Sequence, residues 1–401
     1  MSQHLPFTPD DRGDPPAEFA ERRLAAPLAP VTLPNGNQVL VAVRYEDVRQ
    51  VLGDPRFTRI RYYPDDHGGD QLCEWADIVQ DAIQSDEVET VAQRAAIEAM
   101  SPRNIRAWRP YITELAEQIT ADFAARAQPG DFMEGFAFPL VDQVLDELLG
   151  IPAADRARVR HWSDVTLAMT GVAASEDRMS AGLECFEFAQ GLVRDRQADR
   201  AERSGGHFSC ALIDSLIDAH AAGDLSEAEL DSITTALILG GRTAPTTVGG
   251  GVFGLLSTPG AYRALVDDPA GIPQAVEEIL RCYTGGVAQM LRMAREDVRL
   301  PSGTVQKGQT VLASTVAANF DPQAFADPDR FDIDRAECPH LGLGHGAHYC
   351  VGANLGREML QTGLTALTST LPGLRLAVPP DQVQWFTGLF VRYPTRLPLT
   401  W

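Results

Sequence analysis

A single cysteine stands in a glycine-rich loop directly before a helical pattern. The loop, residues 339–353, reads PHLGLGHGAHYCVGA, and residues 354–360 continue it with helical spacing. Glycines let the backbone turn tightly and approach a flat, bulky group. A cysteine at a helix N-terminus meets free N–H groups and the positive end of the helix dipole, which favour the thiolate. Cys350 is therefore a candidate axial ligand of haem iron.

The loop resembles the haem-ligating loop of the cytochrome P450 family in five positions at fixed spacing: Gly344, Gly346, His348, Cys350 and Gly352. Leu343 takes the place of the phenylalanine that is usual in the family, so the sulfur lacks an aromatic neighbour. The alternative interpretation of Cys350 is a buried structural thiol, because free cysteines are often buried. The length of the pattern favours the iron ligand.

Composition and charge exclude several other classes of protein. The chain has 401 residues, of which 44% are hydrophobic and 22% charged, as in ordinary globular proteins. Its net charge of −21 makes nucleic acid an unexpected partner. The six cysteines include no C-x-x-C pair, so zinc is not indicated. We see no signal peptide and no apolar run of membrane-span length, and we expect a cytoplasmic protein without a membrane anchor.

The elements that must position the cysteine are mostly helices. Residues 17–25, 45–52 and 87–100 fit helices, residues 31–43 fit a hairpin around Asn35-Gly36, and residues 109–220 form a run of amphipathic helices. Two of these, near 155–173 and 177–203, are expected to form a lid. The resemblance implies a mostly α fold with small β-sheets: an N-terminal segment, 1–28, and a single triangular helical domain, 29–401, that encloses haem.

A long apolar helix is predicted from Ser226 to Ser257, where the resemblance implies a central helix beside the oxygen-binding face. The family carries an acid and an alcohol there, which relay protons. One register places Gly240 at the family glycine, Arg242 at the acid and Thr243 at the alcohol. The other places Thr243 at the acid and Ala244 at the alcohol. We favour the first register, and neither supplies a carboxylate.

Two residues make this helix unusual. Arg242 is expected to pair with an anionic substrate or an acidic side chain, since a buried arginine needs a partner; the alternative is that it extends to solvent. Pro245 removes a helix hydrogen bond and is expected to kink or widen the helix.

Further residues match the family one by one. Arg94, Arg292 and His348 would hold haem propionates, although Thr90 replaces the family histidine four residues before Arg94. Glu278 and Arg281 lie three apart on one helix face and resemble the structural ion pair beneath the haem. Candidate substrate-pocket residues come from an irregular loop, the central helix, a small-residue strand and the C-terminal hairpin: Tyr62, Trp75, Leu239, Val287 and Phe390.

The resemblance extends from about residue 40 to the end and implies a cytochrome P450 oxidoreductase of the soluble bacterial, actinobacterial-like type. Such an enzyme carries haem b, and thiolate donation from Cys350 would favour O–O cleavage. Electrons from NAD(P)H would arrive through ferredoxin and ferredoxin reductase, because the chain shows no reductase or flavin domain. The expected substrate is a small natural product of secondary metabolism, and the expected state is a monomer.

Three hypotheses for the function remain open. The first is ordinary monooxygenation, with Thr243 and water relaying protons. The second is atypical oxidation, namely C–C or aryl coupling, rearrangement or peroxide-driven turnover, which the missing carboxylate favours. The third is a non-catalytic haem-binding protein, which would bind haem without forming product from any electron source.

Overall fold

The computed structural model divides the chain into two compact units. It describes residues 15–33, 38–59, 86–166, 175–202, 211–241, 243–284, 291–387 and 392–401. Unit 1 comprises Met1–Ile60, Tyr111–Leu140 and Ala244–Trp401; unit 2 comprises Arg61–Pro110 and Val141–Thr243. Helices dominate and the strands are short, which confirms the predicted fold class. Within the described ranges, no helix is long and apolar enough to cross a membrane.

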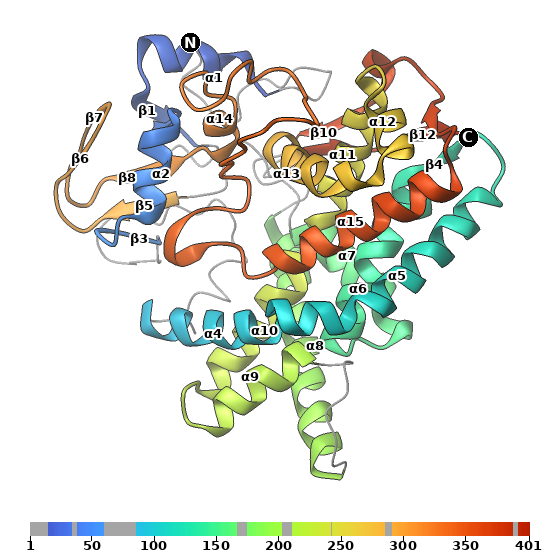
Figure 1. Ribbon diagram of the computed structural model, residues 1–401. Helices are drawn as coiled ribbons and strands as arrows, with labels where there is room; N and C mark the ends of the chain where they lie inside the picture. Colours follow the sequence, from blue (N-terminus) through green and yellow to red (C-terminus); the bar gives the residue numbers. More distant parts are fainter. Residues whose placement is uncertain are drawn as a thin grey trace. The chain divides into compact units, whose positions relative to one another are not determined.

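A five-stranded sheet forms one part of unit 1 (Figure 1). Its strands follow the order β1 (Leu28–Thr32), β2 (Gln38–Ala42), β8 (Thr310–Ala313), β5 (Leu291–Ala294) and β3 (Phe57–Arg59). Strands β2 and β8 are parallel, and the other neighbours are antiparallel. The hairpin begins at Leu28, earlier than the predicted Val31, because β1 is an edge strand and an edge strand tolerates Pro30.

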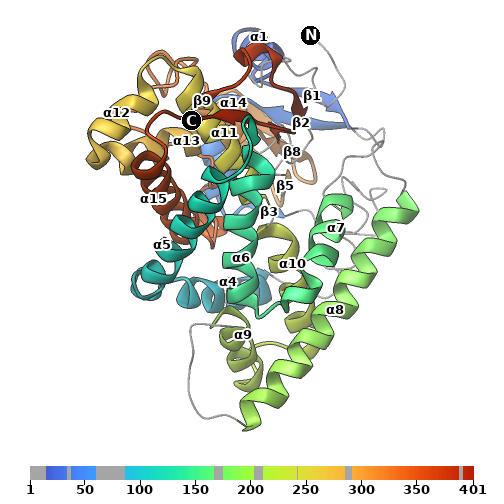
Figure 2. The same cartoon turned by 90° about the vertical axis from the view of Figure 1, so that its right-hand side faces the viewer.

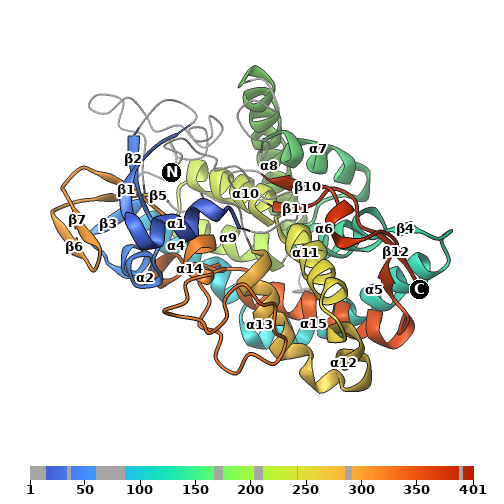
Figure 3. The same cartoon turned by 90° about the horizontal axis from the view of Figure 1, so that it is seen from above.

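The helices of unit 1 are α1 (Ala17–Ala25), α2 (Tyr45–Gly53), α11 (Ala244–Ser257), α12 (Ala261–Asp267), α13 (Ile272–Tyr283), α14 (Thr315–Asn319) and α15 (Ala353–Thr370). Helix α13 packs against both α11 and α15 (Figure 3). A Cβ atom on Gly251 would lie 2.6 Å from Ile279 Cγ2, and one on Gly254 would lie 2.5 Å from Tyr283 Cε2. Glycine therefore permits the close approach of α11 to α13.

Short elements complete unit 1. Two small hairpins pair β6 (Val298–Leu300) with β7 (Gly303–Val305) and β10 (Trp385–Thr387) with β11 (Arg392–Pro394). A three-stranded sheet has the order β4 (Gly130–Asp131), β12 (Pro398–Thr400) and β9 (Arg375–Leu376). Single turns of helix are η1 (Met133–Ala137), η3 (Pro269–Gly271), η4 (Gly346–His348) and η5 (Pro380–Gln382).

Unit 2 is helical over its described residues and contains α4 (Asp86–Ala99), η2 (Ala153–Asp155), α7 (Arg156–Thr166), α8 (Ser175–Glu202), α9 (Ala211–Ala221) and α10 (Glu227–Gly241). Helices α5 (Pro102–Ala124) and α6 (Phe138–Leu149) each run from one unit into the other. Helix α7 lies alongside α8, where Trp162 Nε1 donates to Glu184 Oε2 at 3.0 Å (Figure 2). Arg196 on α8 pairs with Asp214 on α9 at 2.6 Å.

The predicted single helix over Ser226–Ser257 is wrong, because the structure has two helices there. The first helix begins with a cap formed by Ser226 and Glu229. The backbone N–H of Glu229 donates to Ser226 Oγ, and Glu229 Oε2 accepts from the Ser226 N–H in return. Helix α10 ends at Gly241 and α11 starts at Ala244. Pro245 explains the break, since it has no N–H to donate and its ring excludes a preceding helical turn. In the first turn of α11 it costs nothing.

Candidate active site

Two glycines with positive φ shape the loop before Cys350. Gly344 has φ of 80° and Gly346 has φ of 73°, a region that side chains rarely adopt. A Cβ atom on Gly346 would also lie 2.7 Å from the Leu52 carbonyl oxygen at the end of α2. The Cys350 N–H donates to the Leu343 carbonyl at 2.9 Å and closes the loop. The backbone path to the cysteine thus depends on two conformations that favour glycine over every other residue.

The thiol of Cys350 lies at the start of α15. The Ala353 N–H donates to the Cys350 carbonyl at 3.2 Å, and a Cβ atom on Gly352 would lie 3.9 Å from Cys350 Sγ. The expectation that the helix end favours the thiolate is not met by the protein alone. Desolvation raises the pKa of the Cys350 thiol, although the Gly352 N–H and the Arg357 guanidinium act in the opposite direction. A cation at the sulfur would supply the missing stabilisation.

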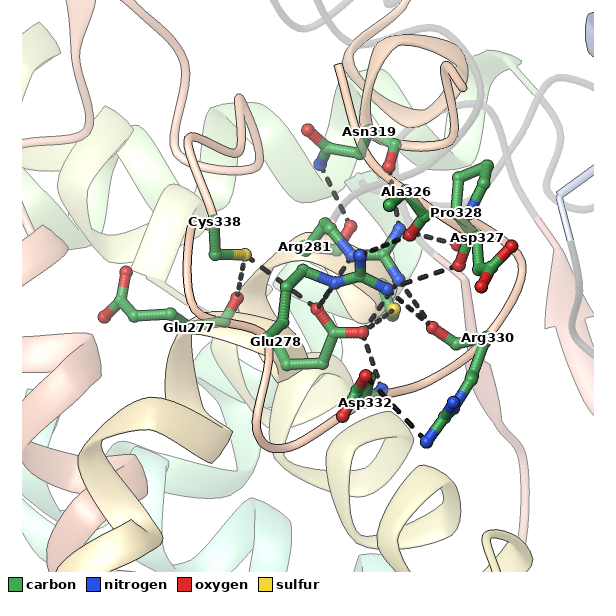
Figure 4. A network of polar contacts seen from close by, with 12 residues as sticks. Glu277, Glu278, Arg281, Asn319, Ala326, Asp327, Pro328, Arg330, Asp332 and Cys338 are labelled. Atoms are coloured by element: carbon green, nitrogen blue, oxygen red, sulfur yellow. Dashed lines mark hydrogen bonds and ion pairs between the residues drawn. The ribbon is translucent and has the colours of Figure 1, made fainter. Parts of the chain in front are cut away.

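A buried ion pair lies on α13, and it extends to the chain before the loop (Figure 4). Arg281 donates to both carboxylate oxygens of Glu278 at 2.8 Å, and both side chains are fully buried. Arg335 adds a third contact, from its Nε to Glu278 Oε2 at 3.0 Å. The remaining guanidinium N–H groups donate to backbone carbonyls, which include those of Asn319 and Pro328. The network therefore ties α13 to the segment 319–335.

Asn319 connects this ion pair to the cysteine loop. Its Nδ2 donates to the Arg281 carbonyl at 3.0 Å, and its Oδ1 accepts from the Leu341 N–H at 2.7 Å. Asn319 is buried at the end of α14. Sequence reasoning missed both Asn319 and Arg335, because their partners are distant along the chain and no local spacing reveals them.

A second ion pair, also missed from the sequence, brackets the loop. Glu277 accepts from Arg357 Nε at 2.7 Å and from Arg357 Nη2 at 2.9 Å, while His340 Nε2 lies 3.1 Å from Glu277 Oε2. The Gly342 N–H donates to His340 Nδ1, so His340 donates through Nε2. Desolvation acts in the opposite direction, but hydrogen bonds from Arg357 and His340 lower the pKa of Glu277 to about 2. One carboxylate thus holds residues on both sides of Cys350.

The other predicted residues are spread over both units. In unit 1, His348 lies in η4 and is half-buried, and Arg292 is buried on β5, where its Nη1 donates to the Leu291 carbonyl at 2.9 Å. In unit 2, Thr90 and Arg94 lie on α4, and Arg94 is exposed.

The end of α10 and the residues that follow it carry three more of the predicted residues. Leu239 is buried there, and a Cβ atom on Gly240 would meet nothing within 4 Å. Thr243 Oγ1 donates to the Gly240 carbonyl at 3.0 Å. Five predicted residues lie outside the described residues: Arg242, Tyr62, Trp75, Val287 and Phe390.

The residues present fit a haem-thiolate centre. Within the described ranges, no group of three or more histidine, cysteine or acidic side chains could hold a metal ion by itself. A single sulfur donor suits haem iron, because the porphyrin supplies the other in-plane ligands. Cys350 is exposed as a whole residue, whereas its sulfur is largely desolvated by the loop, and the backbone N–H of Gly352 faces that sulfur. A backbone N–H that donates to the sulfur would stabilise a metal-bound thiolate.

Comparisons with known proteins agree with this geometry. The family model described as Cytochrome P450 matches residues 272–387. The mycinamicin IV hydroxylase/epoxidase of Micromonospora griseorubida is 36% identical over 96% of this chain and 94% of that protein. Biflaviolin synthase of Streptomyces coelicolor is 32% identical over 96% of this chain and 92% of that protein. The structure of the LnmA cytochrome P450 hydroxylase of Streptomyces atroolivaceus, from the leinamycin pathway, superposes with a TM-score of 0.86 at 36% identity and full coverage of both chains.

Proposed function

Because the chain belongs to the cytochrome P450 family and is a P450 monooxygenase, we propose that Cys350 ligates the haem iron and that the substrate is a small natural product. Haem b, when bound, supplies the one-electron and O2 chemistry. When haem is bound, the Cys350 thiolate would donate electron density to the iron. The observation that supports this assignment is the position of Cys350 in a loop held by Glu277 and by the Glu278–Arg281 pair.

The propionates of the haem need cationic partners from this chain. Arg292, Arg94 and His348 are the assigned donors. A guanidinium group binds a carboxylate in a bidentate manner, and an imidazole N–H donates one hydrogen bond. Thr90 stands where the family has a histidine, so the sequence supplies no imidazole at that position. The burial of Arg292 on β5 supports its role, because a buried guanidinium favours an anionic partner.

The proposed proton relay consists of Thr243 and water. Thr243 is the assigned relay residue, and its hydroxyl can exchange the Gly240 carbonyl for a water molecule. Arg242 is assigned to an anionic group of the substrate or to an acidic side chain. Electrons come from NAD(P)H through ferredoxin reductase and ferredoxin, and the enzyme acts as a cytoplasmic monomer.

The decisive experiment replaces the thiol. Haem-loaded protein should give the red-shifted Soret band of a thiolate-ligated carbon monoxide complex after reduction. Cys350→Ser should lose that band, whereas Cys338→Ser, a matched free cysteine near the loop, should keep it. An unchanged band in Cys350→Ser would refute the assignment.

The second candidate function is atypical oxidation, such as coupling or rearrangement. It is favoured by the segment 240–244, which contains no carboxylate, and by the similarity to a relative named as a synthase. Arg242→Asp separates the two functions. Improved coupling of electron use to hydroxylation would indicate a suppressed relay and favour monooxygenation. Loss of substrate binding would indicate an anion clamp and favour the second candidate.

A further inference from the structure

One ion pair places a positive charge beside the residues that flank Cys350. Arg357 lies in the second turn of α15, and its side chain points back toward the start of that helix. Its Nη1 donates to the Tyr349 hydroxyl at 3.1 Å and to the Ala353 carbonyl at 3.5 Å. The guanidinium thus contacts the residue directly before the cysteine and the first residue of α15.

A cation is unusual at this end of a helix. The N-terminus carries the positive end of the helix dipole, which favours anions and disfavours cations. Arg357 is charged all the same, and its hydrogen bonds to Glu277 raise its pKa further. Its side chain is 25% exposed, so solvent screens the charge only in part. Anions must therefore lie nearby: Glu277 is one, and a thiolate at Cys350 would be a second.

Glu277 binds the guanidinium from the side of α13. Its carboxylate accepts from Arg357 Nε and Nη2, and it lies 3.1 Å from His340 Nε2. Figure 4 shows the Glu277 side chain pointing away from the neighbouring Glu278–Arg281 pair. The guanidinium therefore contacts the residues that flank Cys350, whereas the carboxylate contacts His340. The Glu277–Arg357 pair is neutral as a whole, but its positive member faces the cysteine.

Further contacts hold this orientation. The Gly342 N–H donates to His340 Nδ1 at 3.2 Å, so the imidazole presents its Nε2–H to Glu277. A Cβ atom on Gly342 would collide with the Leu280 carbonyl of α13, so this part of the loop lies close against that helix. The two charges of the pair consequently have fixed places relative to the cysteine loop.

We propose that the Glu277–Arg357 pair sets the reduction potential of the bound haem, because it holds a positive charge beside the Cys350 thiolate. The inference rests on the proposed function, since it requires Cys350 to be the iron ligand. Reduction adds one electron to the iron, and a nearby positive charge favours the added negative charge. Arg357 acts through Cys350 and is therefore a positioning residue. Desolvation raises the pKa of the Cys350 thiol, and the charge of Arg357 acts against it.

The signs of two potential shifts test the proposal. Arg357→Gln removes the positive charge and should lower the equilibrium constant for haem reduction about tenfold, which is about 59 mV for one electron. Glu277→Gln removes the negative charge and should raise that constant. Both variants break the same ion pair, so a purely structural role predicts shifts of the same sign. Optical redox titration of the holoenzymes at neutral pH measures both, and shifts of equal sign or no shift would overturn the proposal.

Two further variants separate charge from other effects. Arg357→Lys keeps the charge and should stay within about twofold of the wild-type equilibrium constant. Arg375→Gln removes one positive charge from an exposed position on β9 and should leave the potential unchanged, because solvent screens that site. A shift in Arg375→Gln as large as that in Arg357→Gln would assign the effect to net charge and overturn the proposal.

Failure of the proposed function is visible separately. The optical spectrum of the carbon monoxide complex reports thiolate-ligated haem before any potential is measured. A normal wild-type spectrum with shifts of equal sign overturns the inference on Arg357 alone, whereas an absent wild-type complex overturns the proposed function as well. If Arg357→Gln binds no haem, Glu277→Gln decides: a raised potential supports the proposal, and a lowered or unchanged one overturns it.

Discussion

Glu277 binds Arg357 through two hydrogen bonds of 2.7 and 2.9 Å, so α13 and α15 are joined directly behind the cysteine loop. The pKa of Glu277 is lowered to about 2 from the ordinary glutamate value of 4.5, so the folded state favours the ionised carboxylate. The stability from this group is therefore fully present above pH ~4.5 and is lost as the pH falls toward 2.

Glu277→Gln should remove, at neutral pH, the stability that the wild type loses in acid. We expect the free energy of unfolding to fall by roughly 2 kcal/mol at pH 7, and the difference from the wild type to shrink below pH ~4.5. Urea unfolding of both proteins between pH 3 and 7 measures the difference. The matched control is Glu337→Gln, which makes the same change at an exposed glutamate. It should alter neither the free energy of unfolding nor its pH dependence. A pH-independent difference would contradict the assigned ionisation.

Arg281→Ala should be far more damaging than loss of an exposed arginine. Among the described residues, it leaves the fully buried Glu278 carboxylate with Arg335 as its one cationic partner. Breaking a buried ion pair in this way costs about 3–5 kcal/mol. Arg330→Ala is the control, because its side chain is largely exposed and meets Asp332 only at 3.9 Å. Haem retention and the urea midpoint should drop in the first variant and stay within error in the second.

Two glycine-to-alanine changes near the cysteine should have opposite signs. Gly346→Ala forces a Cβ atom to within 2.7 Å of the Leu52 carbonyl at a φ of 73°, so we expect a loss of about 2 kcal/mol or more. Gly356→Ala lies inside α15 with nothing within 4 Å of the added atom, so it should gain up to about 1 kcal/mol. Thermal unfolding of the holoenzymes gives both values, and equal shifts would contradict the loop geometry.

The sequence could predict those parts of the site that depend on local structure. The glycine turns before Cys350 and the i,i+3 spacing of Glu278 and Arg281 both act over a few residues, so the printed sequence already contains them. The effect of Pro245 on the helix is also local. The sequence predicts a kink there, whereas the structure has a complete break, with the first helix ending at Gly241.

Contacts between distant segments could not be predicted. Asn319 reaches both Arg281 and Leu341, and His340 meets Glu277, across long stretches of chain whose register only the folded structure fixes. The pKa of the Cys350 thiol also depends on the folded structure and could not be predicted from the sequence. The helix end is a local feature, whereas the desolvation that outweighs it comes from the assembled loop.

The hydroxyl of Thr243 should decide which register of the proton relay is correct. Under the favoured register, Thr243→Ala removes the relay and should lower the ratio of product formed to electrons consumed by about tenfold or more. Thr243→Ser keeps a hydroxyl that can donate to the Gly240 carbonyl, so it should retain most of the coupling. The ratio is measured from NAD(P)H oxidation and product formation in the same reaction. Full coupling in Thr243→Ala, together with a gain in Ala244→Thr, would assign the alcohol position to residue 244.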